Sequence, residues 1–191
     1  KCNVAKPDDV KAMFEELRKE WSHLDILISN AASGVLKPAM ELTKHHWDWT
    51  MDINAAALIW LAQSAVPMME GRKGASIVAT SSLGSIRAFE YYPAVGSSKG
   101  ALESLMRHLC IELAPRGIRC NIVNAGVVET EALEHFPNRE EMISKSKKNT
   151  PAGRLVTPDD VAKITLFLCS DLAEMVHGHT LIVDGGYSVK V

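Results

Sequence analysis

Four short runs rich in β-branched residues alternate with longer amphipathic segments, and this alternation limits the fold more than any other feature of the chain. The runs are Asp25 to Ala31, Ala75 to Ser82, Ile118 to Gly126 and His179 to Gly186. Each is mostly apolar and includes small residues near its end, as expected of buried parallel strands. Strands that alternate with helices form βαβ units. The sequence therefore predicts an α/β fold, a Rossmann-like doubly wound parallel sheet.

The segments between these runs carry helix signals. One helix begins at Pro7, a second runs from about Thr43 to Met69, a third from Pro93 to about Leu113, and a fourth follows an N-cap at Thr157. The long irregular region at about 127–158 combines loop with a short charged helix. Because long ordered loops at strand ends often close over ligands, we expect a substrate lid there.

Composition narrows the class of protein. The chain has 191 residues, 47% of them hydrophobic, and a formal net charge of −2, which indicates one globular domain spanning 1–191. A near-neutral charge argues against nucleic acid or a membrane surface as partner. The most apolar run, Ile53 to Met69, is shorter than the ~20 residues that a bilayer needs. We expect a cytoplasmic protein.

Metal binding is not indicated. The cysteines are scattered without a Cys-x-x-Cys pair, so free thiols are favoured over disulfides or zinc ligands. The paired histidines, His45 with His46 and His177 with His179, have no carboxylate or cysteine at ligand spacing. The sequence predicts no metal site.

The ends of the predicted strands are the expected ligand side, because ligands of doubly wound sheets bind outside the carboxyl ends of the strands. The residues there read SNAAS, TSSLG and NAGVVET. Their small side chains let a bulky ligand approach the backbone. A G-x-G-x-x-G phosphate loop does not occur in the sequence.

Five short elements, in order and at matching intervals, resemble the short-chain dehydrogenase/reductase family. Asn3 and Val4 resemble the element that contacts the adenine of a nicotinamide cofactor. Asn30, Ala31 and Ala32 in ISNAASG resemble the family's Asn-Asn-Ala-Gly element, which runs along the cofactor. The resemblance implies that these five residues bind cofactor.

The remaining elements extend the resemblance to the end of the chain. Gly126, Val128 and Thr130 in NAGVVET resemble the turn that holds the nicotinamide carboxamide, with Ala125 in place of proline. LIVDGG is similar to the family's C-terminal signature. Asn54 in MDINAAAL matches an asparagine that supports a proton relay; an ordinary buried amide is the alternative.

On this alignment the chain begins inside the third strand of the family's fold. The resemblance implies two preceding strand–helix units, roughly 60 residues at about 30 per unit. Those units would hold the phosphate loop and the residues that select NADH or NADPH. We therefore expect a sheet that lacks its first two strand–helix units, and a chain that is inactive by itself.

The catalytic tyrosine is the element that departs from most of the family. Most members have Tyr-x-x-x-Lys, but Val95 stands four residues before Lys99, and Tyr92 stands seven before it. Positions i and i+7 return to nearly the same helical face. Tyr-x6-Lys resembles the enoyl-[acyl-carrier-protein] reductases of bacterial fatty-acid synthesis, closest to the NADPH-dependent type called enoyl reductase III. We expect Tyr91 to pack at the loop–helix junction.

Enoyl reduction accounts for a displaced tyrosine. A ketoreductase protonates the oxygen on the carbon that receives hydride, whereas reduction of an enoyl thioester at its β carbon builds charge on the carbonyl oxygen two carbons away. We expect Tyr92 to be the acid and Lys99 to hold the cofactor ribose and to lower the pKa of Tyr92. Ser82 either helps to hold the carbonyl or caps the strand end.

The resemblance also implies the partners: NADPH, with NADH as the alternative, an acyl thioester on acyl carrier protein or CoA, and a homodimer or homotetramer built through the two long helices. An acidic carrier could dock on the cations of the lid region, although their mixed-sign surroundings are also typical of a solvated helix. These cations are Lys145, Lys147, Lys148 and Arg154.

Three apolar residues could line an acyl pocket or could equally belong to the ordinary core: Met40, Phe136 and Met142.

Two other functions stay open at this point. The first is a 3-ketoacyl or hydroxysteroid-type dehydrogenase whose tyrosine has moved, against which Val95 counts because valine cannot donate a proton. The second is a non-catalytic scaffold or interaction fragment, which the lack of a phosphate loop would favour.

Overall fold

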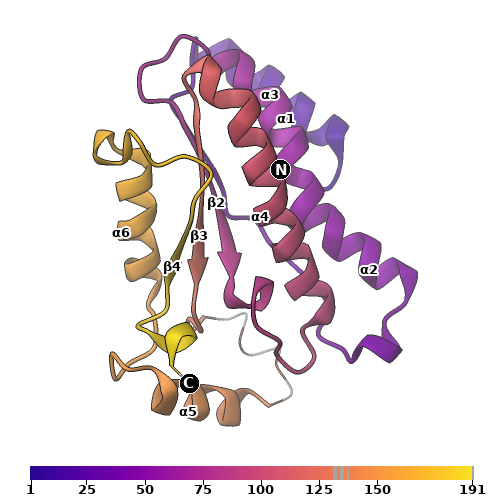
Figure 1. Ribbon diagram of the computed structural model, residues 1–191. Coiled ribbons are helices and arrows are strands. Elements are labelled where there is room, and N and C mark those ends of the chain that lie inside the picture. Colours follow the sequence, from indigo (N-terminus) through magenta and orange to yellow (C-terminus); the bar gives the residue numbers. More distant parts are fainter. Residues whose placement is uncertain (131–132, 134–135, 137, 191) are drawn as a thin grey trace.

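Four parallel strands form the central layer of the molecule. The computed structural model describes residues 1–130, 133, 136 and 138–190. The strands are hydrogen-bonded in the order β1-β2-β3-β4, and helices flank them on both sides (Figure 1). The predicted α/β, Rossmann-like doubly wound sheet is confirmed. The strand bounds are β1 (Ile26–Ser29), β2 (Ser76–Ser82), β3 (Arg119–Ala125) and β4 (Thr180–Val183).

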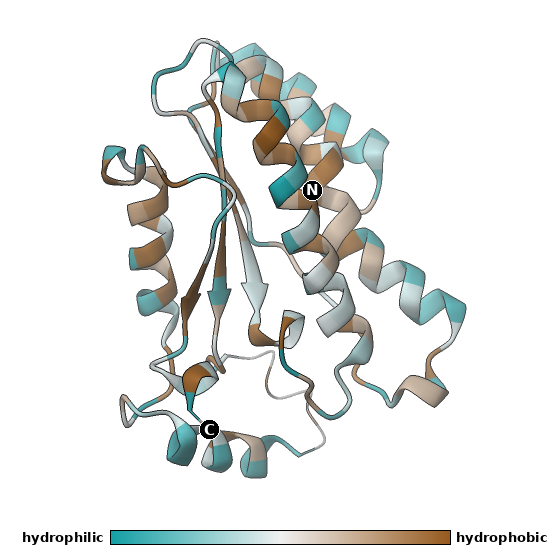
Figure 2. Ribbon diagram, viewed as in Figure 1, coloured by the Kyte–Doolittle hydropathy of each residue, from teal (hydrophilic) through white to brown (hydrophobic). Residues whose placement is uncertain are grey.

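The helices divide between the two faces of the sheet. In Figure 1, α1, α3 and α4 lie on one side of the strands and α6 on the other, while α5 lies beyond the strand arrowheads, at the carboxyl ends. Figure 2 shows α5 mostly hydrophilic, whereas α3 and α4 carry hydrophobic residues. The helices are α1 (Pro7–Glu20), α2 (Lys44–Met51), α3 (Ala57–Met69), α4 (Pro93–Leu113), α5 (Arg139–Asn149) and α6 (Pro158–Cys169).

Alternate residues of the central strands supply two separate cores. Ile77 and Ala79 of β2 pack with α1, α3 and α4 in the larger cluster, while Val78 between them packs with Leu168 of α6 in the smaller one. This two-residue period is inherent to the pleated strand. The two central strands, β2 and β3, thus have one face in each core, whereas Ile26 and Ile28 of the edge strand β1 are exposed.

The long helix predicted from Thr43 to Met69 forms in three consecutive pieces: α2, a π-helical segment at Asp52–Ala56, and α3. Thr43 caps it by accepting a hydrogen bond from the His46 amide, and the His46 side chain accepts one from the Thr43 amide. The π-helical segment was not predicted. Such segments are uncommon and often occur at functional sites.

The first residues differ from the prediction. We expected them to be the end of a strand, but residues 1–6 form a loop and a turn ahead of α1. Their polar groups bond locally: the Asn3 side chain accepts from the Ala5 amide, and the Asn3 carbonyl accepts from the Lys6 amide. Within the described chain no strand pairs with this segment, and a strand needs a partner to satisfy its backbone.

The predicted lid region holds α5 and an isolated parallel bridge between Val128 and Val156. Residues 131–132, 134–135 and 137 of this region lie outside the described residues, so its role as a lid stays a prediction. Within the described part of the chain, every helix is too short or too polar to span a bilayer.

Candidate active site

Tyr92 and Ser82 meet at the carboxyl end of β2. Tyr92 immediately precedes α4, whose first residue is Pro93, and its hydroxyl donates a hydrogen bond of 3.4 Å to Ser82 Oγ. Ser82 also accepts from the Gly84 amide at 3.2 Å, because it caps the short 3-10 turn Leu83–Ser85. Two predicted catalytic residues are therefore together. Ser82 caps the turn that follows the strand, and its part in holding a substrate carbonyl stays a prediction.

Two glycines let the Tyr92 ring lie flat against that turn. A Cβ added at Gly84 would stand 2.4 Å from Tyr92 Cε1, and one added at Gly96 would stand 2.6 Å from the Gly84 carbonyl oxygen. Real Cβ atoms do not approach so closely, so glycine is required at both positions. Tyr91 adopts a left-handed backbone, with φ of 61°, which turns the chain into α4.

Aromatic rings enclose Tyr92. Phe136 stacks on it with ring centroids 5.7 Å apart, and Phe89 approaches edge-on at 6.1 Å. Burial raises the pKa of Tyr92, and the hydrogen bond with Ser82 opposes that rise. The expectation that Lys99 lowers this pKa is wrong for this structure, because burial dominates. The phenol is therefore a protonated acid at neutral pH.

Lys99 is buried, with 6% of its surface exposed. Its Nζ donates to the Thr80 carbonyl oxygen at 2.8 Å, which ties α4 to β2. Burial lowers the pKa of Lys99 to about 8, while the Glu103 carboxylate acts in the opposite direction.

Asn54 joins the loop after β1 to α4. Its Oδ1 accepts from the Ser33 amide at 2.9 Å, and its Nδ2 donates to Ser98 Oγ at 2.9 Å. Ser98 in turn donates to the Val95 carbonyl oxygen at 2.7 Å. Asn54 is buried, and both ends of its amide have protein partners. Its part in a proton relay stays a prediction.

Val95, which stands where most of the family has tyrosine, has a packing role. It is buried, and a Cβ added at Gly34 would lie 2.3 Å from Val95 Cγ2. The loop after β1 therefore passes directly over this position. A proton donor is found at Tyr92 instead.

The predicted cofactor residues gather in part around one cavity of about 610 Å³ at the carboxyl ends of β1, β2 and β3. Asn30, Val128 and Thr130 line it, with Thr80 and one face of α6. The cavity also extends from Ile26, at the start of β1, along α6, and most of its lining there is apolar. Its strand-end part, with Asn30, Val128 and Thr130, is where a dinucleotide would be expected to bind. The other predicted cofactor residues are not in its lining: Asn3, Val4, Ala31, Ala32, Lys99 and Gly126.

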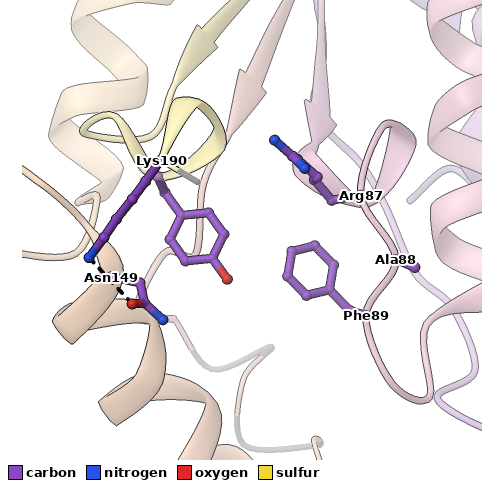
Figure 3. Close-up of a pocket in the computed structure, with 6 residues that line it drawn as sticks. Arg87, Ala88, Phe89, Asn149 and Lys190 are labelled. Carbon is purple, nitrogen blue, oxygen red and sulfur yellow. Dashed lines mark hydrogen bonds between the residues drawn. The ribbon is translucent and has the colours of Figure 1, made fainter.

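A second cavity, of about 450 Å³, lies beyond Phe89. Figure 3 shows Arg87 and Phe89 on one side of it and Asn149 and Lys190 on the other. Lys190 Nζ donates to Asn149 Oδ1 at 3.4 Å, and Arg87 donates to the Ser188 carbonyl oxygen. Phe89 also lies edge-on to Tyr92, so it stands between this cavity and the candidate acid's ring.

The residues expected at the substrate side are dispersed. Phe136 contacts Tyr92, and Met142 lines a small pocket beside α5, but Met40 is 93% exposed and far from any core. Arg154 is paired with Asp160 through hydrogen bonds of 2.6 and 2.9 Å, so it is not available to a partner. The described residues contain no group of three potential metal ligands.

Sequence reasoning missed a buried polar cluster next to these residues. Glu103 of α4 and Asn124 of β3 are both buried, and Asn124 Nδ2 donates to Glu103 Oε1 at 2.8 Å. A signal existed: Glu103 follows Lys99 by four residues and stands between Leu102 and Met106, on the apolar face of its helix. An acid at such a position needs partners.

Comparison with known proteins agrees with this geometry. A protein family described as "Enoyl-(Acyl carrier protein) reductase" matches residues 1–188. The chain belongs to this family. It is an enoyl-acyl-carrier-protein reductase family member with the short-chain dehydrogenase/reductase fold, and the family and its relatives indicate an oxidoreductase that uses a nicotinamide cofactor.

The family's known members include reductases and dehydrogenases. The chain is 37% identical over 190 residues to 1-cyclohexenylcarbonyl-CoA reductase of Streptomyces collinus, covering 98% of the chain and 67% of the relative. It is 33% identical over 193 residues to the enoyl-acyl-carrier-protein reductase [NADH] of Aquifex aeolicus, covering 99% and 71%. An NAD-dependent glycerol dehydrogenase of Listeria innocua is 33% identical over 188 residues, covering 98% and 74%.

A solved structure agrees in three dimensions. The crystal structure of enoyl-acyl-carrier-protein reductase (NADH) from Aquifex aeolicus superimposes with a TM-score of 0.93 at 31% identity, over 98% of this chain and 74% of that one. The fold of the enoyl-acyl-carrier-protein reductase family therefore extends over the whole described chain.

Proposed function

We propose that the protein is an enoyl-[acyl-carrier-protein] reductase that reduces the C=C bond of enoyl thioesters with NADPH. The observation that carries the proposal is the placement of Tyr92: the partly buried phenol lies 3.4 Å from Ser82 Oγ, and valine fills the position four residues before Lys99. A protonated phenol is a suitable acid for an oxygen that gains charge during the reaction.

Each side chain of the site has a separate role in the proposed reaction. The cofactor supplies hydride when it is bound. Tyr92 donates its proton to the thioester carbonyl oxygen, and Ser82 orients the phenol through its hydrogen bond. Lys99 holds a positive charge and binds the ribose hydroxyls. Phe89 and Phe136 keep water away from the phenol.

NADPH is proposed from likeness to the enoyl reductase III type. The Aquifex aeolicus relative is named for NADH, so NADH is the alternative that an assay must include. The other partners are part of the same proposal: an acyl thioester on acyl carrier protein or CoA, and further copies of the chain in a homodimer or homotetramer. For the carrier we propose docking at Lys145, Lys147 and Lys148 of α5, without Arg154.

A ketoreductase or dehydrogenase is the second candidate, and the glycerol dehydrogenase among the relatives favours it. Its acid would have to reach the oxygen on the carbon that exchanges hydride. Val95 has no proton to give, so Tyr92 or Ser82 would have to take that part.

The test uses the full-length protein and follows NADPH and NADH oxidation with a crotonyl thioester and with an acetoacetyl thioester. We expect turnover of the crotonyl substrate, and Tyr92→Phe should lower its kcat by about 10²- to 10⁴-fold, the usual contribution of a general acid. Tyr91→Phe is the matched control and should retain wild-type kcat. Turnover of the acetoacetyl substrate alone, with little effect of Tyr92→Phe, would reject the proposal.

A further inference from the structure

A buried carboxylate lies one helical turn beyond Lys99. Glu103 is four residues further along α4, so it lies on the same face of the helix. It is 7% exposed. An ionised group is rarely buried to this extent without partners, because removal from water is costly. The position of Glu103 therefore calls for a reason.

Three donors converge on one oxygen of this carboxylate. Glu103 Oε1 accepts from Ser81 Oγ at 2.6 Å, from Ser85 Oγ at 2.7 Å and from Asn124 Nδ2 at 2.8 Å. All three partners donate, which is the pattern that an acceptor-only carboxylate requires. Short bonds to a charged acceptor are about twice as strong as neutral ones.

The three donors come from three different elements. Ser81 lies near the end of β2, Ser85 lies in the 3-10 turn, and Asn124 lies near the end of β3. Asn124 Nδ2 also donates to the Ser82 carbonyl oxygen at 3.1 Å and to Ser85 Oγ at 3.0 Å. One side chain of α4 thus fastens two strand ends and the turn between β2 and Tyr92.

Every residue of the proposed reaction is attached to this cluster. Ser82 is held on one side by the Asn124 bond, and the turn beneath the Tyr92 ring is held by Ser85. Lys99 is linked to the cluster by charge. Within the described chain the Glu103 carboxylate is the charge that affects its pKa, and its hydrogen bond goes to the neutral carbonyl of Thr80 in β2.

We propose that Glu103 is a positioning residue for the reduction, whose carboxylate clamps the ends of β2 and β3 and the Leu83–Ser85 turn against α4 so that Ser82, Tyr92 and Lys99 keep their relative positions. It does not touch substrate or cofactor. The inference rests on the proposed function, because it assigns Glu103 to the site that Tyr92 and Lys99 form.

Two variants separate the charge from the hydrogen bonds. Glu103→Gln keeps an acceptor oxygen of the same shape but removes the charge, whereas Glu103→Ala removes both. We expect Glu103→Ala to lower kcat by about 30- to 100-fold with KM changed less than about 3-fold, because misplacement by about 1 Å can cost such a factor. Glu103→Gln should lose only about 3- to 10-fold.

The pH profile gives a readout that a merely structural role would not move. Burial lowers the pKa of Lys99 to about 8, and the negative charge of Glu103 opposes that shift. Loss of the Glu103 charge lowers the pKa of Lys99 further, so Lys99 loses its proton at lower pH. The alkaline limb of kcat/KM should therefore move to lower pH by about 0.5 to 1 unit in Glu103→Gln. Glu112→Gln, an exposed acid on the same helix, is the matched control and should leave the limb in place.

The outcomes distinguish this inference from the proposed function. The affinity for NADPH can be measured by fluorescence as a function of pH. This binding measurement reports the charge of Lys99 and requires no reaction. If no enoyl thioester is reduced but the NADPH titration of Glu103→Gln is shifted relative to wild type, the function is wrong and the positioning role stands. If wild type reduces the thioester and Glu103→Gln matches it in kcat and in both pH profiles, the positioning role is wrong.

Discussion

The two faces of the sheet differ in how completely they are covered. On one face, α1, α3 and α4 pack over a large cluster that includes Phe14, Leu58 and Leu102. On the other, α6 covers only part, and Ile26 and Ile28 of β1 are about half exposed, beside the 610 Å³ cavity.

The difference separates two tasks. The covered face holds α4, and with it Tyr92, Lys99 and Glu103, so the acid and its supports are fixed by a packed core. The open face holds the cavity with Asn30 and Thr130, where a bulky ligand has room. The candidate acid is thus held by a packed core, whereas the other face keeps an open cavity along β1 and α6 in the described chain.

The largest effect should come from removing a side chain of the covered core. Leu102 is 2% exposed in that core, whereas Leu166 of α6 is 70% exposed. We expect Leu102→Ala to lower the free energy of unfolding by about 2–5 kcal/mol, through lost burial and the cavity left behind. Leu166→Ala should change it by less than about 0.5 kcal/mol. Denaturant unfolding of the two variants measures both values.

A cost above about 1 kcal/mol at Leu166 would contradict the comparison, since it would mean that this face is covered in solution. Equal, small costs at both positions would contradict the packing of α4 against the sheet. Leu168, buried on the same helix, serves as the control: Leu168→Ala should cost nearly as much as Leu102→Ala.

A smaller effect is expected from crowding the candidate acid. The Cβ of Gly84→Ala would overlap the Tyr92 ring at 2.4 Å, so the ring has to move away from Ser82. We expect kcat to fall about 10- to 100-fold while NADPH affinity stays near wild type, because the cavity lies elsewhere. Gly100→Ala is the control: this glycine is helical, and the added Cβ would stand 3.7 Å from the Ser85 carbonyl oxygen, an ordinary contact, so kcat should be unchanged. A loss of cofactor affinity instead of rate would show that the two sites are not separable.

Much of this architecture follows from the sequence, and the remainder has identifiable physical causes. The β-branched runs and the Pro7, Thr43, Pro93 and Thr157 signals predicted the strands and helices, because those signals are local. The π-helical segment at Asn54 was not predictable, since one inserted residue leaves the apolar pattern nearly unchanged.

The candidate site divides in the same way. The seven-residue spacing of Tyr92 and Lys99 is visible in the sequence and placed both on α4. The Glu103 cluster was missed because its donors, Ser81, Ser85 and Asn124, come from separate elements that only the folded chain brings together. The direction of the Tyr92 pKa was wrong because burial raises it and the only opposing cause is the hydrogen bond with Ser82, not the charge of Lys99.

The smallest effect should come from Tyr91, whose left-handed backbone costs about 1–2 kcal/mol for a residue with a Cβ. Asparagine tolerates this region better, so Tyr91→Asn should raise the free energy of unfolding by about 0.5–1 kcal/mol. Tyr91→Phe keeps the Cβ and the strain, and should leave stability unchanged. Because the turn itself is retained, Tyr92 should stay against Ser82 and kcat should remain within about 3-fold of wild type. A larger loss of kcat in Tyr91→Asn would mean that the Tyr91 ring, and not only its backbone, holds the candidate acid in place.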